Sequence, residues 1–273
     1  MSTIVFEAGS PRSLLSDLRR LVRHRDLLLL LTQKDLKLKY KGTALGFLWS
    51  FLNPLLMMIV YAAVFSVIAR IQMPNYPVFL LAGMLPWNAF IISIMTSSTA
   101  IVGNANLVRR VDFPREFLPL ATVLSSLVNL ALSLVILFVF ALVFRQPLGL
   151  PLLALPAVIV LQLLLTSGVA LVLASLMVYF RDVENLITLA TTVLFFGTPI
   201  IYRIQDLHGH ANLKLILGAN PLAWLIGAYQ DIWHANTWPD PLHMLLLALV
   251  ASLSLIAGWV VFRRLEGSFA EEV

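Results

Sequence analysis

Hydrophobic and polar positions are distributed along the chain in long blocks rather than in short alternations. Six blocks are almost continuously apolar and reach the length of roughly 20 residues that a helix needs to cross a bilayer. Apolar residues do not alternate with polar ones within these blocks, which favours helices over membrane-spanning strands. The pattern predicts an all-α polytopic membrane protein with transmembrane helices near residues 45–69, 78–102, 117–144, 152–180, 183–202 and 242–262.

An amphipathic segment precedes the first apolar block. Ser10 and Pro11 suit the N-cap and the first position of a helix, and the leucines of residues 14–21 then share one helical face. Basic side chains occupy the opposite face. This pattern predicts a helix over residues 10–33 that lies along the membrane surface, with its basic face toward lipid phosphates. A basic tail that only orients the chain is the alternative.

The connection between the fifth and sixth blocks is irregular. It contains two apolar stretches that are too short to span a bilayer, separated by Asn220 and Pro221. A hydrophobic piece of about 10–14 residues is typical of re-entrant or interfacial segments. We therefore expect a short helical hairpin over residues 205–232 that dips into the membrane from outside. It would gate a path, with Pro199, Asn220 and Pro221 as gate residues.

The charges indicate an orientation. The chain has a net charge of +5, and nine of its 19 lysines and arginines precede Gly42. If both termini are cytoplasmic, fifteen of these basic residues lie inside and four lie outside. Such a bias predicts cytoplasmic termini in a bacterial inner (plasma) membrane, and it explains the basic character through membrane lipids rather than through nucleic acid.

Several motifs of catalysis are missing from the sequence. No lysine follows a glycine, so there is no Walker A loop, and without cysteine there is no thiolate metal site. The acids lie in connections or at span ends, which disfavours ion coupling through buried carboxylates. Asp206, His208 and His210 form the only concentration of possible metal ligands, and we expect no metal site there. The chain is predicted to be no enzyme and to take its energy from another protein.

The connection after the second block combines apolar and basic residues. Asn106 suits the N-cap of a short helix, and Pro114 disfavours the helical conformation of Phe113, so the helix is expected to end there. Such a helix would present its residues to a groove on a cytosolic protein, or would serve as a basic turn at lipid head groups. The residues concerned are Asn106, Leu107, Val108, Arg109, Arg110, Val111, Asp112 and Phe113.

Four different sequence motifs are spaced along the chain and together form a recognisable pattern. They are KYKGTALGFLW (39–49) with NPLL (53–56), NLVRR (106–110) with FPREFLPL (113–120), YFRDV (179–183) with TPIIY (198–202), and NPL (220–222). In this order and spacing they resemble the membrane subunit of polysaccharide-exporting ABC transporters of the ABC-2 type. That group serves O-antigen, capsule and teichoic acid export.

The resemblance implies the ABC-2 (type V exporter) fold and a division of labour. It implies a homodimer of this subunit with two copies of a P-loop ATPase. The ATPase would bind ATP and Mg²⁺, and this chain would hold no cofactor. Residues 106–113 would be the coupling helix that inserts into the ATPase, and residues 205–232 would be external gate helices. The substrate would be a polyprenyl-pyrophosphate-linked polysaccharide that moves from the cytoplasmic to the external side.

A polysaccharide that crosses about 30 Å of hydrocarbon needs partners for the hydrogen bonds it made with water. Aromatic faces, hydroxyl groups and amides are suitable. Candidate channel-lining residues are Trp49, Phe51, Asn53, Tyr61, Trp87, Asn88, Ser93, Thr96, Ser97, Phe195, Phe196 and Tyr202. Candidate residues that attract the carrier pyrophosphate are Lys37, Lys39, Tyr40, Lys41 and Arg181. Each also has a structural explanation: belt aromatics, helix packing, hydroxyls bonded to their own helix, or orientation by charge.

Two further sequence features remain open. Gly42 and Gly46 form a small-x-x-x-small pair that could bring two backbones close, within the chain or across a dimer. The alternatives to polysaccharide export are an ABC-2 exporter of a small lipid or drug, a membrane-bound glycosyltransferase, and a passive channel.

Overall fold

The computed structural model describes residues 25–45, 48–64, 73–110, 113–206 and 211–273, which form helices and loops without any strand. Four of these helices are long and apolar enough to cross a membrane, and they correspond to the second, third, fourth and sixth predicted spans. The all-α prediction is therefore confirmed for the described residues. The four helices are α4 (Tyr76–Ser98), α6 (Phe117–Val143), α7 (Leu155–Tyr179) and α11 (Pro241–Leu265).

The first and fifth predicted spans correspond to shorter helices. α3 covers Trp49–Ala63, and residues 65–72, which would complete the predicted span, lie outside the described residues. α8 (Val183–Phe196) has 14 residues, because the chain turns at Gly197 before Pro199. A helix of roughly 20 residues is needed to cross a bilayer. A count of six spans therefore stays a prediction.

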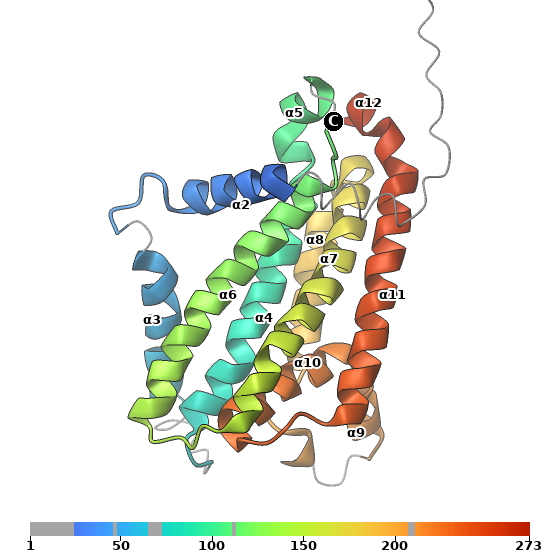
Figure 1. Cartoon of the computed structure of the whole chain (residues 1–273). Coiled ribbons are helices and arrows are strands. Elements are labelled where there is room, and N and C mark those ends of the chain that lie inside the picture. Colours follow the sequence, from blue (N-terminus) through green and yellow to red (C-terminus); the bar gives the residue numbers. More distant parts are fainter. Residues whose placement is uncertain (1–24, 46–47, 65–72, 111–112, 207–210) are drawn as a thin grey trace, which may run out of the picture.

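α4 is the central helix of the bundle and lies between α6 and α7 (Figure 1). It also contacts α10, and most of its side chains are buried, whereas Ile92, Met95 and Thr96 in its second half are exposed. Such a helix, apolar all round, belongs in a core. The outer helices instead expose apolar side chains such as Val143 of α6 and Leu245 of α11. These surfaces are suited to lipid.

The closest helix packing joins α7 to α11. A Cβ atom added at Gly168 of α7 would overlap the backbone of Ser254, and one added at Gly258 would overlap the carbonyl of Gly168. The hydroxyl of Ser254 also donates to the carbonyl of Leu165, at 3.3 Å. Small residues four apart allow this approach, which is common between membrane helices. α7 and α11 therefore pack backbone against backbone.

The two ends of the bundle carry different short helices (Figure 1). The α5 end carries α2 (Arg25–Tyr40), η3 (Val102–Asn104), α5 (Ala105–Arg110), η7 (Glu266–Ser268) and α12 (Phe269–Glu272). The α10 end carries η4 (Leu150–Ala154), η5 (Ile204–Asp206), α9 (Ala211–Gly218), α10 (Pro221–Gln230) and the π-helical turn η6 (Asp231–Ala235). The segment expected to form a hairpin is thus two short helices, and its depth in a membrane stays a prediction.

α2 lies across the long helices and contacts α6 (Figure 1). Of the interface helix predicted over residues 10–33, residues 10–24 lie outside the described residues. The helix does not end at 33 but continues to Tyr40, with Lys37 and Lys39 in its last turn, where positive charge complements the helix dipole.

Gly42 follows α2 with a φ of 77°, which suits a helix stop. A Cβ atom there would meet open space. Within this chain Gly42 therefore ends a helix rather than bringing two backbones together, and Gly46 lies outside the described residues.

Candidate functional site

The predicted coupling helix corresponds to α5 at the α5 end. It begins at Ala105, so Asn106 lies inside the helix rather than at its N-cap, which corrects the sequence-based expectation. The preceding turn is held by Asn104, whose amide donates to the carbonyl of Ala100 at 2.8 Å. The Oδ1 atom of Asn104 accepts from the ammonium group of Lys34 in α2, at 2.9 Å. Asn104, rather than Asn106, therefore holds the start of this segment in place.

The apolar face of α5 is turned into the protein. Val108 is only 2% exposed, and Leu107 is half-buried against the same cluster of side chains. The expectation that Val108 is presented to a partner is therefore wrong, because the residue completes the core beneath α5. Asn106 and Arg109 are exposed on the outer face. The side chain of Arg110, and Val111 and Asp112 entirely, lie outside what the structure describes, and Phe113 is half-buried.

The core beneath α5 is completed by the carboxyl-terminal residues of the chain. Phe269 of α12 is fully buried, and its ring centroid lies 5.3 Å from that of Phe262 and 6.2 Å from that of Tyr179. The hydroxyl of Tyr179 donates to the carbonyl of Leu265 at 2.9 Å, which fixes the end of α11. α12 also contacts α5 directly. α5 thus rests on a base formed by α7, α11 and α12.

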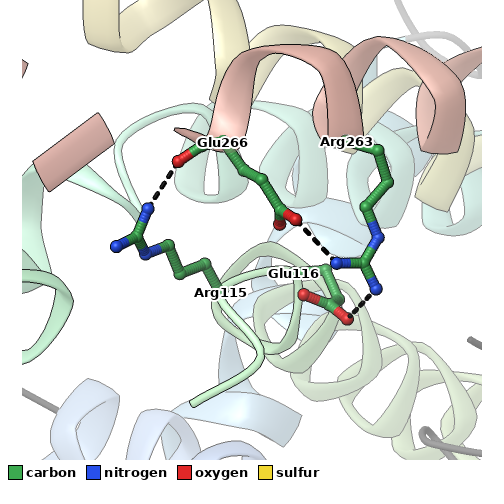
Figure 2. Close-up of polar contacts among 4 residues, drawn as sticks. All are labelled: Arg115, Glu116, Arg263 and Glu266. Carbon is green, nitrogen blue, oxygen red and sulfur yellow. Dashed lines mark hydrogen bonds and ion pairs between the residues drawn. The ribbon is translucent and has the colours of Figure 1, made fainter. Parts of the chain in front are cut away.

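A network of ion pairs joins the chain after α5 to the end of α11 (Figure 2). The guanidinium of Arg263 lies between two carboxylates, 3.1 Å from Oε1 of Glu116 and 2.6 Å from Oε1 of Glu266. Arg115 donates to the backbone carbonyl of Glu266. We call these four residues, Arg115, Glu116, Arg263 and Glu266, the charged clamp.

The charged clamp is largely removed from water. Glu116 is 2% exposed and stands at the N-cap position of α6, where the helix dipole favours a negative charge. The Arg263 guanidinium lies 5.5 Å from the ring centroid of Trp259, within the range of a cation–π interaction. Because buried charges are tolerated only when they are paired, each partner fixes the position of the others. The start of α6 is thereby tied to the end of α11.

The structure places the predicted channel residues in three environments. Trp87 is buried, with its ring 5.8 Å from that of Phe195, while the hydroxyls of Ser93, Thr96 and Ser97 donate to carbonyls of their own helix. Asn88 is half-buried, and Tyr202 donates to the Phe196 carbonyl at 2.8 Å. Trp49 and Phe196 are exposed. The side chains of Phe51, Asn53 and Tyr61 lie outside those described. A channel role for these residues stays a prediction.

The predicted gate residues are brought together by Asn220. Its side chain accepts from the backbone N–H of Leu222 and so caps α10, where Pro221 is the first residue. The same side chain donates to the carbonyl of Gly197 at 2.9 Å and to Oγ1 of Thr198 at 3.1 Å, beside Pro199. The end of α8 and the start of α10 are therefore tied together. A gating role is not tested by this contact.

The residues predicted to attract a pyrophosphate are spread over the α5 end. Lys37, Lys39 and Lys41 are exposed at the carboxyl end of α2, and Arg181 is exposed in the turn between α7 and α8. In Figure 1 the carboxyl end of α2 points away from α7 and α8. The side chain of Tyr40 lies outside those described. His208 and His210 also lie outside, and the described part of the chain contains no cluster of metal ligands.

Sequence reasoning missed a buried polar chain through the bundle. Gln162 of α7 is fully buried and donates to the carbonyl of Pro86 in α4, at 2.9 Å. Its Oε1 atom accepts from the hydroxyl of Tyr229 in α10, at 2.7 Å. A lone glutamine inside an apolar span was the available signal, because polar residues at membrane depth require partners.

The comparisons with known proteins agree over most of the chain. The sequence profile of the family described as ABC-2 type transporter matches residues 26–233. The O-antigen export system permease protein RfbA of Myxococcus xanthus is 35% identical over 255 residues, which cover 93% of this chain and 98% of that protein. The protein of the same name from Klebsiella pneumoniae is 32% identical over 247 residues, which cover 90% of this chain and 94% of that protein.

Proposed function

The chain belongs to the ABC-2 type transporter family, and from that membership we propose that it is the permease subunit of an ATP-driven exporter of polysaccharide. The observation that carries the proposal is the nearly full-length similarity to two proteins named as O-antigen export permeases. The cargo would be an O-antigen, capsule or teichoic-acid-like polymer on a polyprenyl pyrophosphate carrier.

The orientation follows from the charge distribution. We place the α5 end in the cytoplasm of a bacterial inner membrane, because fifteen of the basic residues then lie inside. In that orientation the exposed face of α5, with Asn106 and Arg109, is available to a P-loop ATPase. The base of α5 and the charged clamp would carry the force of ATP hydrolysis into α6 and α11.

The assembly that we propose is a homodimer with two ATPase copies. α8 supports this proposal, because it buries only Val183 and Ile187 among its described side chains and leaves Leu189, Val193 and Phe196 largely exposed. This surface, and separately the exposed apolar residues of α3, are suited to lipid, to a second copy, or to the aromatic wall of a sugar path. The two shorter helices would complete six spans in each subunit.

Purification of the complex tests the proposal. A tagged chain isolated in mild detergent is expected to bring down one P-loop ATPase chain for each permease chain. Membrane vesicles that contain both proteins are then expected to transfer labelled, lipid-linked polysaccharide across the bilayer when ATP is supplied. Transfer without any nucleotide-hydrolysing partner, or ATP-dependent transfer of small lipids but not of polymer, would contradict this function.

Charge reversal on the exposed face of α5 tests the coupling role. Arg109→Glu is expected to reduce polymer transfer by about tenfold or more, because like charges placed across an interface repel. Thermal stability should not change, since the side chain is exposed. Arg264→Glu is the matched control, because Arg264 is also exposed at the α5 end but lies on α11. Equal transfer by both variants would count against α5 as the coupling helix.

A further inference from the structure

A cavity of about 440 Å³ lies at the α10 end, between the loop after α8, the helix α10, the turn η6 and the start of α11. This volume is within the range of roughly 300–1,000 Å³ that is typical of small-molecule sites. Arg203, Asp240 and His243 on its border are exposed, so the cavity reaches the surface. Of the residues discussed above, Pro199 and Tyr202 also line this cavity, whereas its other aromatic side chains and its acidic ones have been given no role.

One wall of the cavity is a fixed aromatic pair. The rings of Trp224 and His243 are stacked, with centroids 5.9 Å apart and planes inclined by 15°. The indole N–H of Trp224 donates to the carbonyl of Gly218 at 2.6 Å. Nδ1 of His243 lies 3.1 Å from Oδ2 of Asp240, whose Oδ1 accepts from the backbone N–H of Leu242. Both rings are therefore held in place before any ligand arrives.

The cavity lining also contributes hydrogen-bonding groups. Asp231 faces the cavity from η6, and no hydrogen bond or ion pair joins its carboxylate to another described side chain. Burial, reinforced by the charge of Asp240 and opposed by His243, raises its pKa to about 6. Gln230 also lines the cavity, and its amide nitrogen is held by the carbonyls of Pro199 and Ile200 at 3.2 Å. A half-buried carboxylate without a donor is suited to a ligand that brings hydroxyl groups.

We propose that this cavity binds a neutral sugar unit, with the Trp224–His243 pair against the sugar ring and the Asp231 carboxylate accepting from its hydroxyl groups. Aromatic faces bury the apolar face of a pyranose, and carboxylates form strong hydrogen bonds with hydroxyl donors. Two acids, Asp231 and Asp240, line the cavity against one arginine, Arg203, and this excess of negative charge disfavours a sugar that itself carries a carboxylate. The inference rests on the proposed function, since it assigns a contact for the polymer after it has crossed the membrane.

Binding by the intact protein in lipid nanodiscs, without maltoside detergent, is the direct test. The probe is a set of short oligosaccharides released by mild acid from the surface polysaccharide of the source cells, observed by saturation-transfer NMR. Wild type is expected to bind them. Trp224→Ala should weaken binding by about three- to tenfold. Asp231→Asn should weaken it by about tenfold or more, because a hydrogen bond to a charged group is lost.

Matched variants control for indirect effects. Trp238→Ala removes the same ring from the same end of the molecule, at a residue that is 58% exposed and does not line the cavity. Glu184→Gln neutralises an exposed carboxylate at the other end. Both should bind as wild type does, and all four variants should melt within a few degrees of it at neutral pH.

Three outcomes would overturn the inference. Wild type that binds no fragment, or Trp224→Ala and Asp231→Asn variants that bind as wild type does, would exclude the cavity as a sugar site. Fragments that bind equally well after oxidation of their primary hydroxyls to carboxylates would exclude the preference for neutral sugars. ATP-dependent polymer transfer, measured on the same preparations, separates the two ideas. Transfer without fragment binding refutes only this site, whereas absence of transfer refutes the proposed function.

Discussion

The two ends of the bundle pair their buried polar groups in different ways. At the α5 end, polar groups that leave water are charged and paired, as in the contact of Arg263 with Glu116 and Glu266. At the α10 end they are mostly neutral amides that hold backbone carbonyls, as Gln230 and Asn220 do. Removing one partner of a buried ion pair lowers the stability of the folded protein strongly, whereas removing a single neutral hydrogen bond lowers it less. Single substitutions are therefore expected to cost more stability at the α5 end than at the α10 end.

Neutral hydrogen bonds also join the loops at the α10 end to one another. The side-chain amide of Asn75 donates to Oε1 of Gln146 at 2.7 Å, and Gln146 donates in turn to the backbone carbonyl of His234. The ring of His234 contacts the Pro74 carbonyl at 2.9 Å. Three loops are thereby joined without an ion pair. Each of these contacts is neutral, and we expect each to contribute less to stability than a buried ion pair does.

Substitution of Arg263, the central residue of the charged clamp, should reduce stability more than any other change at either end. Arg263→Met leaves Glu116 buried beside a neutral side chain, and we expect the free energy of unfolding to fall by about 3–5 kcal/mol. Thermal melting in detergent measures the loss. Arg264→Met, one residue further along α11 and exposed, should change stability by less than about 0.5 kcal/mol. Combining Arg263→Met with Glu116→Gln should recover part of the loss. Equal melting of the two single variants would show that the charged clamp is dispensable.

Loss of the Phe269 ring should produce the next largest effect, confined to one end. Phe269→Ala opens a cavity beneath α5, and a cost of about 3 kcal/mol is expected. Hydrogen exchange should accelerate in α5 and remain unchanged in α10. Phe180→Ala serves as the control, because Phe180 lies at the same end and is 62% exposed. Faster exchange at both ends would mean that the ends are not independent.

Removal of the cap of α10 should have a smaller effect at the other end. Asn220→Ala deletes the cap and two contacts with the end of α8, and we expect a loss of about 1–2 kcal/mol. Exchange should increase in α10 and not in α5, the reverse of the Phe269 variant. Asn185→Ala, at an exposed position of α8, is the comparison. A loss as large as that of Arg263→Met would remove the contrast between charged and neutral joints.

The pH dependence of stability should show the smallest effect. Asp231 has a pKa of about 6 in the folded protein, against 3.8 for an ordinary aspartate. Between these values the folded state holds a proton that the unfolded state has released, so stability falls as pH rises through this window. Asp231→Asn should make the melting temperature less dependent on pH there and raise it above pH 6. An unchanged pH profile would contradict the assignment.

The sequence predicted much of the fold for a simple physical reason. Burial in lipid demands long apolar helices, so periodicity and length alone identified the four long spans that the structure contains. The same reasoning was weaker at Gly197, because α8 stops where backbone and turn chemistry prevail over hydropathy. Likewise, asparagine is a favoured N-cap residue, but α5 follows directly after the η3 turn and begins at Ala105, two residues before the position that a cap at Asn106 predicts.

Contacts between distant segments could not be predicted in this way. Glu116 and Arg263 are 147 positions apart, and nothing local in either segment specifies the other. Val108 was assigned to the outer face of α5 because the pattern of a six-residue helix does not say which side α12 covers. The close approach of Gly168 on α7 to Ser254 and Gly258 on α11 likewise became evident only in three dimensions.

The close contact of α7 with α11 has a mechanical consequence. Where two backbones touch, no layer of side chains remains to bend or slide, so the pair behaves as a single beam. α11 has 25 residues and is therefore about 38 Å long. One end of this beam carries Arg263 and the other carries His243. We therefore expect a tilt of α11 at the ion pairs to displace His243 and the cavity wall at its other end.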